Sequence, residues 1–170
     1  MDNAIAKLSW KKSSQDGGIY YALQEAFSHA TGHYILVLGS DDRFVDNFAL
    51  ARAAEQIDLT QNVAIYYSDL YIERNGNITR KNYPDYLDFS KQYSGGSFIH
   101  HQSAFVSLYH LQRLDDYFNF EYELHADYDQ MLKLGKIASV KKMDGAFVIF
   151  QTGGSSTKLS NVVRSISEIR

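Results

Sequence analysis

Residues 36–44, LVLGSDDRF, set an apolar run directly against two adjacent aspartates, Asp41 and Asp42. The run at residues 34–38 is short and continuous, which predicts a buried strand inside an α/β sheet. The aspartates would then lie outside the carboxyl end of that strand, where open α/β sheets bind their ligands. A hard divalent cation is one explanation for two neighbouring carboxylates. A turn in which an aspartate caps a helix is the alternative, and the local sequence alone favours the turn.

Composition limits the class of protein. The chain has 170 residues, 45% of them hydrophobic, which is enough for one folded domain over residues 1–170. A formal net charge of −3 provides no broad basic field for nucleic acid. The chain has no cysteine, no apolar run of membrane-spanning length and no signal-peptide core. We therefore expect a soluble, cytoplasmic protein with no nucleic-acid partner.

Periodicity and turn residues predict the other elements. Ile19 begins a helical pattern that ends at Thr31-Gly32, and Asn75-Gly76 is the strongest short turn signal. Helices are expected at residues 19–30, 46–57 and 125–134, from Tyr109 and from about Leu159. Strands are expected at residues 63–67, 137–141 and 146–151, with a hairpin at residues 71–81.

Three further groups of polar residues are candidates for a site. Asp127 and Asp129 lie in a predicted helix, where residues two apart point to different sides, so one of them could serve as a general base. Charge complementing the helix dipole is the alternative. His100 and His101 would face opposite ways in a strand, so only one could share a site. The loop at residues 153–156 offers amides and hydroxyls to phosphate, or is simply a turn.

The order of these segments is more specific than any one of them. The series DGGIYYALQEAFSHATGHYILVLGSDDRF, HHQSAFV, HADYDQMLKLGK and FVIFQTGGSS closely resembles bacterial family 2 glycosyltransferases of the GT-A type. Members read D-x-G-I-Y-D-A, then an apolar strand with a carboxylate motif, H-Q-x-x-F, A-D-Y-D-L and a late G-G-x-S. The resemblance runs from about Gln15 to Ser156. It implies an α/β fold with a three-layer α/β/α mixed sheet.

The resemblance also implies a reaction. Relatives transfer a sugar from a nucleotide-sugar donor, commonly a UDP-sugar, to a glycan or lipid-linked acceptor in surface polysaccharide biosynthesis. Asp41 matches the carboxylate that holds Mg²⁺ or Mn²⁺ against the diphosphate, and Asp42 is its acidic neighbour. Asp127 matches the general base of an inverting transfer. His101 matches the histidine of the H-Q pair beside the acceptor.

Further residues follow from the same resemblance. Those expected near the substrates are Gln102 and Asp129 in the acceptor pocket, Asp16, Gly18 and Ser40 at the nucleotide, and Gly154, Ser155 and Ser156 at the diphosphate.

The chain departs from the family pattern in two ways. Gly39 stands where relatives have the first metal-motif carboxylate or an asparagine, and Tyr21, Gln24 and Ala26 replace the family's residues in the first motif. Relatives also begin with a nucleotide-binding strand, helix and strand whose motifs are absent before Ala4. We therefore expect a sheet truncated at its N-terminal side, an exposed edge and a homo-oligomer that covers it. The alternative to a transferase is a non-catalytic remnant that acts as a binding or assembly module. Membrane contact is expected to be at most peripheral, at the inner face.

Overall fold

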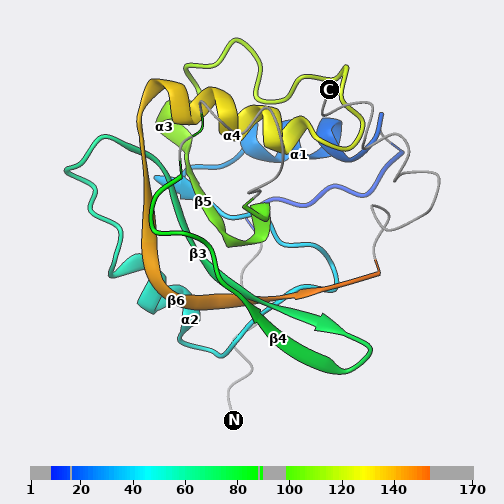
Figure 1. The fold of residues 1–170 in the computed structure, drawn as a ribbon. Coiled ribbons are helices and arrows are strands. Elements are labelled where there is room, and N and C mark those ends of the chain that lie inside the picture. The colour runs from blue at the N-terminus through cyan, green and yellow to red at the C-terminus, as the bar shows by residue number, and fades with distance from the viewer. Residues whose placement is uncertain (1–8, 16, 88, 90–98, 154–170) are drawn as a thin grey trace.

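The computed structural model describes residues 9–15, 17–87, 89 and 99–153 (Figure 1). These residues form a mixed six-stranded sheet in the order β1-β5-β3-β6-β2, with β4 paired to β3 outside that path. β3 and β6 run parallel, and the other pairings are antiparallel. The strands are β1 (Tyr34–Ile35), β2 (Arg43–Phe44), β3 (Val63–Arg74), β4 (Asn77–Lys81), β5 (Ala104–Ser107) and β6 (Ser139–Gln151).

Helices cover both faces of this sheet. They are α1 (Ile19–Ser28), α2 (Ala49–Ala54), α3 (Leu108–Leu111) and α4 (Ala126–Ile137), with a 3₁₀ turn η2 (His101–Ser103) before β5. Figure 1 shows α1 and α4 over one face and α2 at the other. Among the described residues, no helix combines the length and the apolar character that a membrane span requires.

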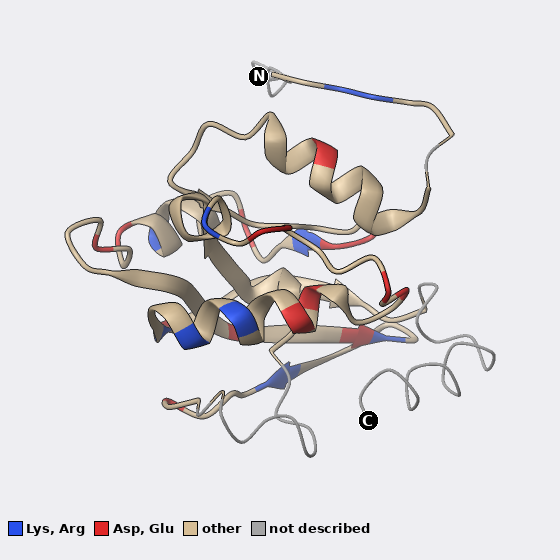
Figure 2. Cartoon of the chain, turned by 90° about the horizontal axis from the view of Figure 1, so that it is seen from above, with Lys and Arg blue, Asp and Glu red and all other residues tan. Residues whose placement is uncertain are grey.

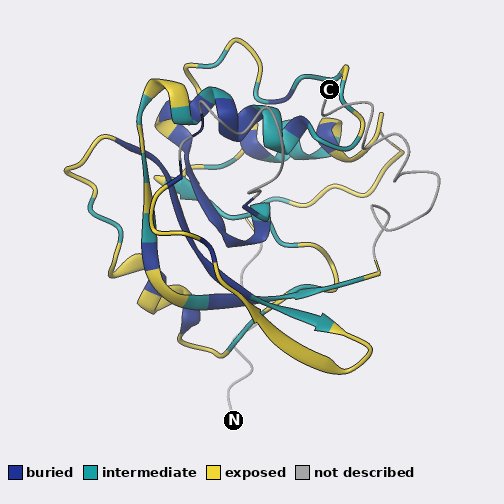
Figure 3. Ribbon diagram, in the orientation of Figure 1, coloured by how far each residue is buried: buried dark blue, intermediate teal, exposed yellow. Residues whose placement is uncertain are grey.

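The core is divided between the two faces. Tyr67 of β3 packs in the cluster that includes α1 and α4, whereas its neighbour Tyr66 packs in the cluster that includes Ala49 and Ala53 of α2. Successive side chains of a strand point to opposite faces, so β3 contributes to both clusters. Figure 3 shows the buried residues concentrated on β3, β5 and the inner side of α4. The expected mixed α/β fold, with helices on both faces of the sheet, is confirmed.

The predicted hairpin is also confirmed. β3 and β4 pair with Arg74 opposite Asn77, which leaves a two-residue turn. Asn75 has φ 51° and Gly76 has φ 77°, and the type I′ turn requires positive φ at both positions. β4 itself is exposed along its whole length (Figure 3).

Several predicted boundaries are wrong. Residues 34–38 are half-buried rather than buried, and only Tyr34–Ile35 form a strand, because β1 lies at the end of the sheet. The strand predicted at residues 63–67 continues to Arg74. The two strands predicted at residues 137–141 and 146–151 are one strand, β6, which passes through Gly145 at φ 96°. The predicted helix at residues 46–57 is reduced to α2.

The last two differences involve His101 and Gly135. His101 lies in a 3₁₀ turn rather than in a strand. α4 continues past Gly135 to Ile137, because the missing side chain makes room for Phe89. The helix expected from Leu159 lies outside the described residues.

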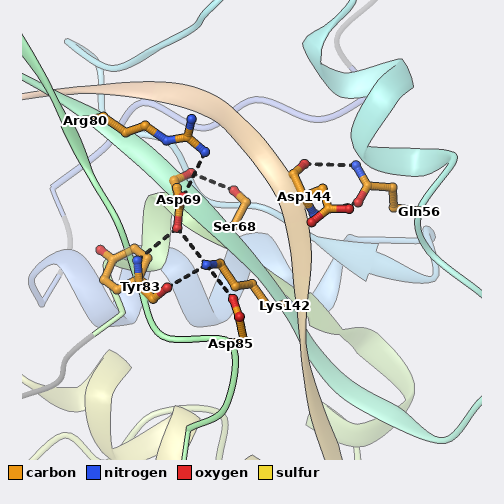
Figure 4. Close-up of polar contacts among 8 residues, drawn as sticks. All are labelled: Gln56, Ser68, Asp69, Arg80, Tyr83, Asp85, Lys142 and Asp144. Carbon is orange, nitrogen blue, oxygen red and sulfur yellow. Dashed lines mark hydrogen bonds and ion pairs between the residues drawn. The ribbon is translucent and has the colours of Figure 1, made fainter.

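A buried aspartate explains why β3 does not stop at residue 68 (Figure 4). The side chain of Asp69 is 6% exposed, and it accepts hydrogen bonds of 2.9 Å from Arg80 and 2.9 Å from the backbone N–H of Tyr83. Nζ of Lys142 lies 3.3 Å from the Asp69 carboxylate and 3.0 Å from that of Asp85. Burial would raise the pKa of Asp69, but these donors and charges outweigh it and hold the pKa below its usual range. Through Asp69, this network connects β4 and Tyr83 to strands β3 and β6.

Candidate active site

The first turn of α4 brings Asp127 against His101 of η2. Nδ1 of His101 lies 2.8 Å from Oδ2 of Asp127. Oδ1 of Asp127 accepts hydrogen bonds of 3.0 Å from the phenol of Tyr20 and 3.0 Å from the backbone N–H of Tyr128. The phenol of Tyr20 also lies 2.7 Å from the carbonyl oxygen of Leu124, so its single hydrogen is shared between two acceptors. Three segments, α1, η2 and α4, thus meet at one carboxylate.

These contacts determine the charge state of the carboxylate. Burial would raise the pKa of Asp127, but hydrogen bonds from His101, Tyr20 and the backbone N–H of Tyr128 hold the pKa below its usual range. Burial and the charge of Asp127 together raise the pKa of the Tyr20 phenol. At neutral pH Asp127 is therefore an ionised acceptor and Tyr20 a neutral donor.

His100 fixes the turn that carries His101. Its carbonyl accepts hydrogen bonds from the backbone N–H (2.9 Å) and the hydroxyl (2.8 Å) of Ser103. Nδ1 of His100 lies 2.5 Å from the phenol oxygen of Tyr83, which also accepts the His100 backbone N–H at 3.1 Å. The two histidine rings contact different residues, Tyr83 and Asp127, although His101 lies in a 3₁₀ turn and not in the strand that the prediction assumed. Because the Asp69 network holds Tyr83, it also supports η2.

The charge environment of His100 connects the two acidic ends of the site. Burial lowers the pKa of His100, so the ring is neutral at neutral pH. The charges of both Asp127 and Asp42 act in the opposite direction and raise this pKa. His100 therefore lies within electrostatic reach of the α4 carboxylate and of the turn after β1.

The turn after β1 uses its two aspartates differently. Oδ2 of Asp42 accepts the backbone N–H of Gly39 at 2.8 Å, and Oδ1 accepts the backbone N–H of Gln151 at 3.1 Å. A Cβ at Gly39 would lie 2.9 Å from Oδ2 of Asp42, so glycine permits this close approach. Asp41 is exposed, and no hydrogen bond to it is found within the described part of the chain. Ser40 is exposed in the same turn.

The carboxylates of Asp41 and Asp42 fit a metal site that is completed by substrate phosphate. The described residues contain no cluster of three or more metal-ligating side chains. Mg²⁺, however, is commonly bound through one or two carboxylates together with substrate phosphates. Asp41 has an uncommitted carboxylate, and each oxygen of Asp42 retains a lone pair beyond its amide contact. The pair therefore suits a cation that is completed by a diphosphate and not one held by protein alone.

The remaining predicted residues lie in different places. Asp129 is in the first turn of α4 and forms an ion pair of 2.6 Å with Lys133, and no contact joins it to His101 among the described residues. Figure 2 shows the acidic start of α4 followed by its lysines. Gln102 is buried in η2 beside His101. Gly18 precedes α1 at φ 121°, a conformation that favours glycine. The predicted site residues outside the described part of the chain are Asp16, Gly154, Ser155 and Ser156.

Two residues of the site are not found by the sequence analysis, Tyr20 and Tyr83. The apolar Ile19 begins the helical pattern at residues 19–30, yet Ile19 is 61% exposed and Tyr20 is 8% exposed. Tyr20 and Phe27, seven residues apart, are the buried positions of α1. A phenol on a buried helix face needs a polar partner, and that signal could have identified Tyr20.

Comparison with known proteins places the chain in a family. Residues 7–118, more than half of the chain, match the model for "Glycosyl transferase family 2". The chain belongs to this family.

Two curated relatives are both polysaccharide synthases. The chain is 28% identical over 151 residues to a chondroitin synthase of Pasteurella multocida (strain Pm70). The matched region covers 88% of the chain and 15% of that protein. It is 29% identical over 133 residues to a hyaluronan synthase of Pasteurella multocida, covering 78% of the chain and 13% of that protein. The chain thus corresponds to a small part of each relative.

Proposed function

We propose that this chain transfers a sugar from a nucleotide-sugar donor, with UDP as the carrier, to a glycan or lipid-linked acceptor in surface polysaccharide biosynthesis. The transfer is metal-assisted and inverts the anomeric centre. Family membership and the two synthases support this class of reaction. Its proposed location is the cytoplasm, with peripheral contact at the inner face of the membrane, where a lipid-linked acceptor would be presented.

One observation carries the proposal. The ring of His100, the residue before His101, lies 5.3 Å from the ring of Phe150, and the next residue, Gln151, donates its backbone N–H to Asp42 at 3.1 Å, so the turn with two aspartates lies near the Asp127–His101 pair. Glycosyl transfer requires this combination, because the acceptor hydroxyl must lose a proton while the diphosphate leaves with additional negative charge. In the proposed site the Asp127–His101 pair receives the proton. Asp41, supported by Asp42, holds Mg²⁺ or Mn²⁺, which neutralises the charge on the leaving diphosphate.

The experiment is a measurement of UDP release by the full chain in the presence of Mn²⁺. Donors are UDP-glucose, UDP-N-acetylglucosamine, UDP-N-acetylgalactosamine and UDP-glucuronic acid, and acceptors are chondroitin and hyaluronan oligosaccharides, because of the two relatives. Asp127→Asn should lower the rate by about 100-fold or more. Asp85→Asn is the control for the loss of one carboxylate, since the Asp85 side chain is 96% exposed and pairs with Lys142 outside the proposed site. The absence of release with every donor would contradict the proposal and favour a non-catalytic binding module.

We propose further that two copies of the chain associate beside β1. A groove of about 620 Å³ lies there, lined by Leu36, Leu38, Phe44, Leu50, Ile57 and Leu59. Leu50 and Leu59 are 51% and 58% exposed. β1 ends the sheet order, and an antiparallel edge can pair with its own copy across a two-fold axis. A second copy is therefore the proposed partner of this surface.

A further inference from the structure

His101 and Asp127 differ in how much hydrogen-bonding capacity remains on their side chains and in how exposed those side chains are. An ionised carboxylate has about four lone-pair positions. Asp127 uses three of them, for Tyr20 and the Tyr128 amide at Oδ1 and for His101 at Oδ2. The side chain of Asp127 is 14% exposed, whereas that of His101 is 33% exposed. The histidine is thus the more accessible member of the pair.

The space around Asp127 is also small. The cavity that Asp127 and His101 share with apolar residues of α1, α4 and the sheet has a volume of about 50 Å³. This volume holds a few water molecules but no monosaccharide. An acceptor hydroxyl cannot enter it with its sugar ring, so the acceptor reaches the pair from the exposed side of the histidine.

The hydrogen bond between the two residues fixes the tautomer of the ring. Asp127 is ionised and can only accept, so Nδ1 of His101 carries the hydrogen. In the neutral imidazole, Nε2 then has a free lone pair. No contact of Nε2 is found within residues 9–15, 17–87, 89 and 99–153. A carboxylate that orients a histidine in this way leaves the outer nitrogen as the base.

We propose that Nε2 of His101, oriented by Asp127, accepts the proton of the acceptor hydroxyl. The step rests on the transferase function proposed above. The acceptor oxygen forms a bond to the anomeric carbon as the bond from that carbon to the diphosphate oxygen breaks, and the diphosphate leaves with the electron pair. The hydroxyl proton moves to Nε2, which converts His101 into an imidazolium beside the Asp127 carboxylate. Asp127 is then a positioning residue, and His101 is the catalytic one.

The groups that face His101 are compatible with this change of charge. Asp127 from α4 is ionised and stabilises the imidazolium. Tyr20 from α1 stays a neutral phenol because burial and Asp127 raise its pKa. His100, the neighbouring residue, is neutral because burial lowers its pKa. The described part of the site therefore has one net negative charge before the step and none after it.

Two substitutions at position 101 separate the roles. In His101→Asn the amide N–H₂ can replace Nδ1 and still donate to Asp127, but nothing replaces Nε2. If His101 only supports Asp127, this variant retains UDP release within a few-fold. If Nε2 accepts the proton, UDP release falls by about 100-fold or more. UDP affinity in the presence of Mn²⁺ should stay unchanged, and so should the melting temperature. His101→Gln, which loses the donor to Asp127, is the companion variant and should be equally inactive.

A second measurement does not depend on activity. Long-range ¹H–¹⁵N correlation spectra of the full chain report which ring nitrogen of each histidine carries hydrogen, and His101→Asn identifies the His101 signals. We expect the Nδ1–H form in the wild type and a shift toward the Nε2–H form in Asp127→Ala. An Nε2–H form in the wild type would overturn the proposal, as would an active His101→Asn. A wild-type chain that releases no UDP but shows the Nδ1–H form would overturn the transferase function and the step that rests on it, with the pairing itself established.

Discussion

Oδ1 of Asp42 accepts a hydrogen bond of 3.1 Å from the backbone N–H of Gln151, which joins the turn after β1 to the end of β6. Oδ2 of the same side chain accepts the N–H of Gly39 at 2.8 Å. The adjacent Asp41 is exposed. Two neighbouring aspartates that look equivalent in the sequence therefore have different roles, one mainly in the backbone of the turn and one toward solvent and the proposed cation.

We expect substitutions at the two positions to separate stability from cation binding. Asp42→Asn places an amide N–H₂ where two backbone N–H groups need acceptors, and should lower the free energy of unfolding by about 1–2 kcal/mol. Asp41→Asn should change it by less than about 0.5 kcal/mol. Asp41→Asn should instead weaken Mn²⁺-dependent UDP binding. Urea unfolding and calorimetry measure the two quantities, and equal stability losses in both variants would contradict this division.

Asp69 and Asp85 both contact Lys142 and offer a second comparison of two aspartates. Asp69 is 6% exposed and Asp85 is 96% exposed, although both contact the same ammonium group. Asp69→Asn leaves Arg80 and Lys142 near an uncharged group in a buried place, so we expect a loss of about 3 kcal/mol in the free energy of unfolding. Asp85→Asn removes an exposed ion pair and should cost less than about 1 kcal/mol. Urea unfolding at neutral pH measures both, and similar losses would show that burial does not determine the energy here.

Asp69 also predicts how stability depends on pH. Its pKa in the folded chain lies below the ordinary value of about 3.9, so the unfolded chain binds the proton more tightly. The stabilisation is complete above the unfolded pKa and is lost as pH falls through the folded pKa. The free energy of unfolding should therefore decline below about pH 4, and less steeply in Asp69→Asn than in the wild type. Asp127, whose pKa is also lowered, gives the same direction and accounts for decline that remains in the variant.

Local signals predicted much of the fold. α1 and the Asn75-Gly76 hairpin lie where periodicity and turn chemistry place them. The family resemblance implied that Asp127 and His101 both lie near the acceptor, and in the structure the two side chains are in contact. Contacts between distant segments could not be predicted in this way. Tyr20 is 107 residues from Asp127 in the chain, and no local pattern joins them.

The charged partners of Asp69 explain why β3 extends to Arg74 when the strand was predicted to end at residue 67. Ser68 and Asp69 looked like the end of the strand because an aspartate is unfavourable inside a sheet. In the structure, Arg80 from β4 and Lys142 from β6 neutralise Asp69, so β3 can continue. The neutralising residues are visible in the sequence only once the sheet order is known.

Gly135 provides a test of close packing within α4. A Cβ at this position would lie 2.6 Å from Cγ of Phe89, which is closer than real contacts allow. Gly135→Ala gains about 1 kcal/mol in helix propensity. The clash should outweigh this gain and give a net loss of about 1–2 kcal/mol in the free energy of unfolding. Phe89→Ala removes the two ring atoms at 2.6 and 2.8 Å and leaves the 3.1 Å approach to Cβ, so in that background the same substitution should cost at least about 1 kcal/mol less, which thermal or urea unfolding of the four chains tests.

The groove beside β1 predicts the oligomeric state. Leu59 lines this groove and is 58% exposed. If a second copy covers it, the wild type should be a dimer by light scattering at micromolar concentration, and Leu59→Glu should be a monomer because the interface would bury an unpaired charge.

Ile78 on β4 offers a matched control for this substitution. It is 49% exposed, similar to Leu59, but is not among the residues that line the groove. Ile78→Glu should therefore remain a dimer with the wild-type mass. Both variants should keep the melting temperature that the wild type shows at low concentration, where the dimer dissociates, because an exposed side chain contributes little to the fold of one copy. A monomeric wild type with a cooperative melt would show that the groove is not an interface between copies of this chain.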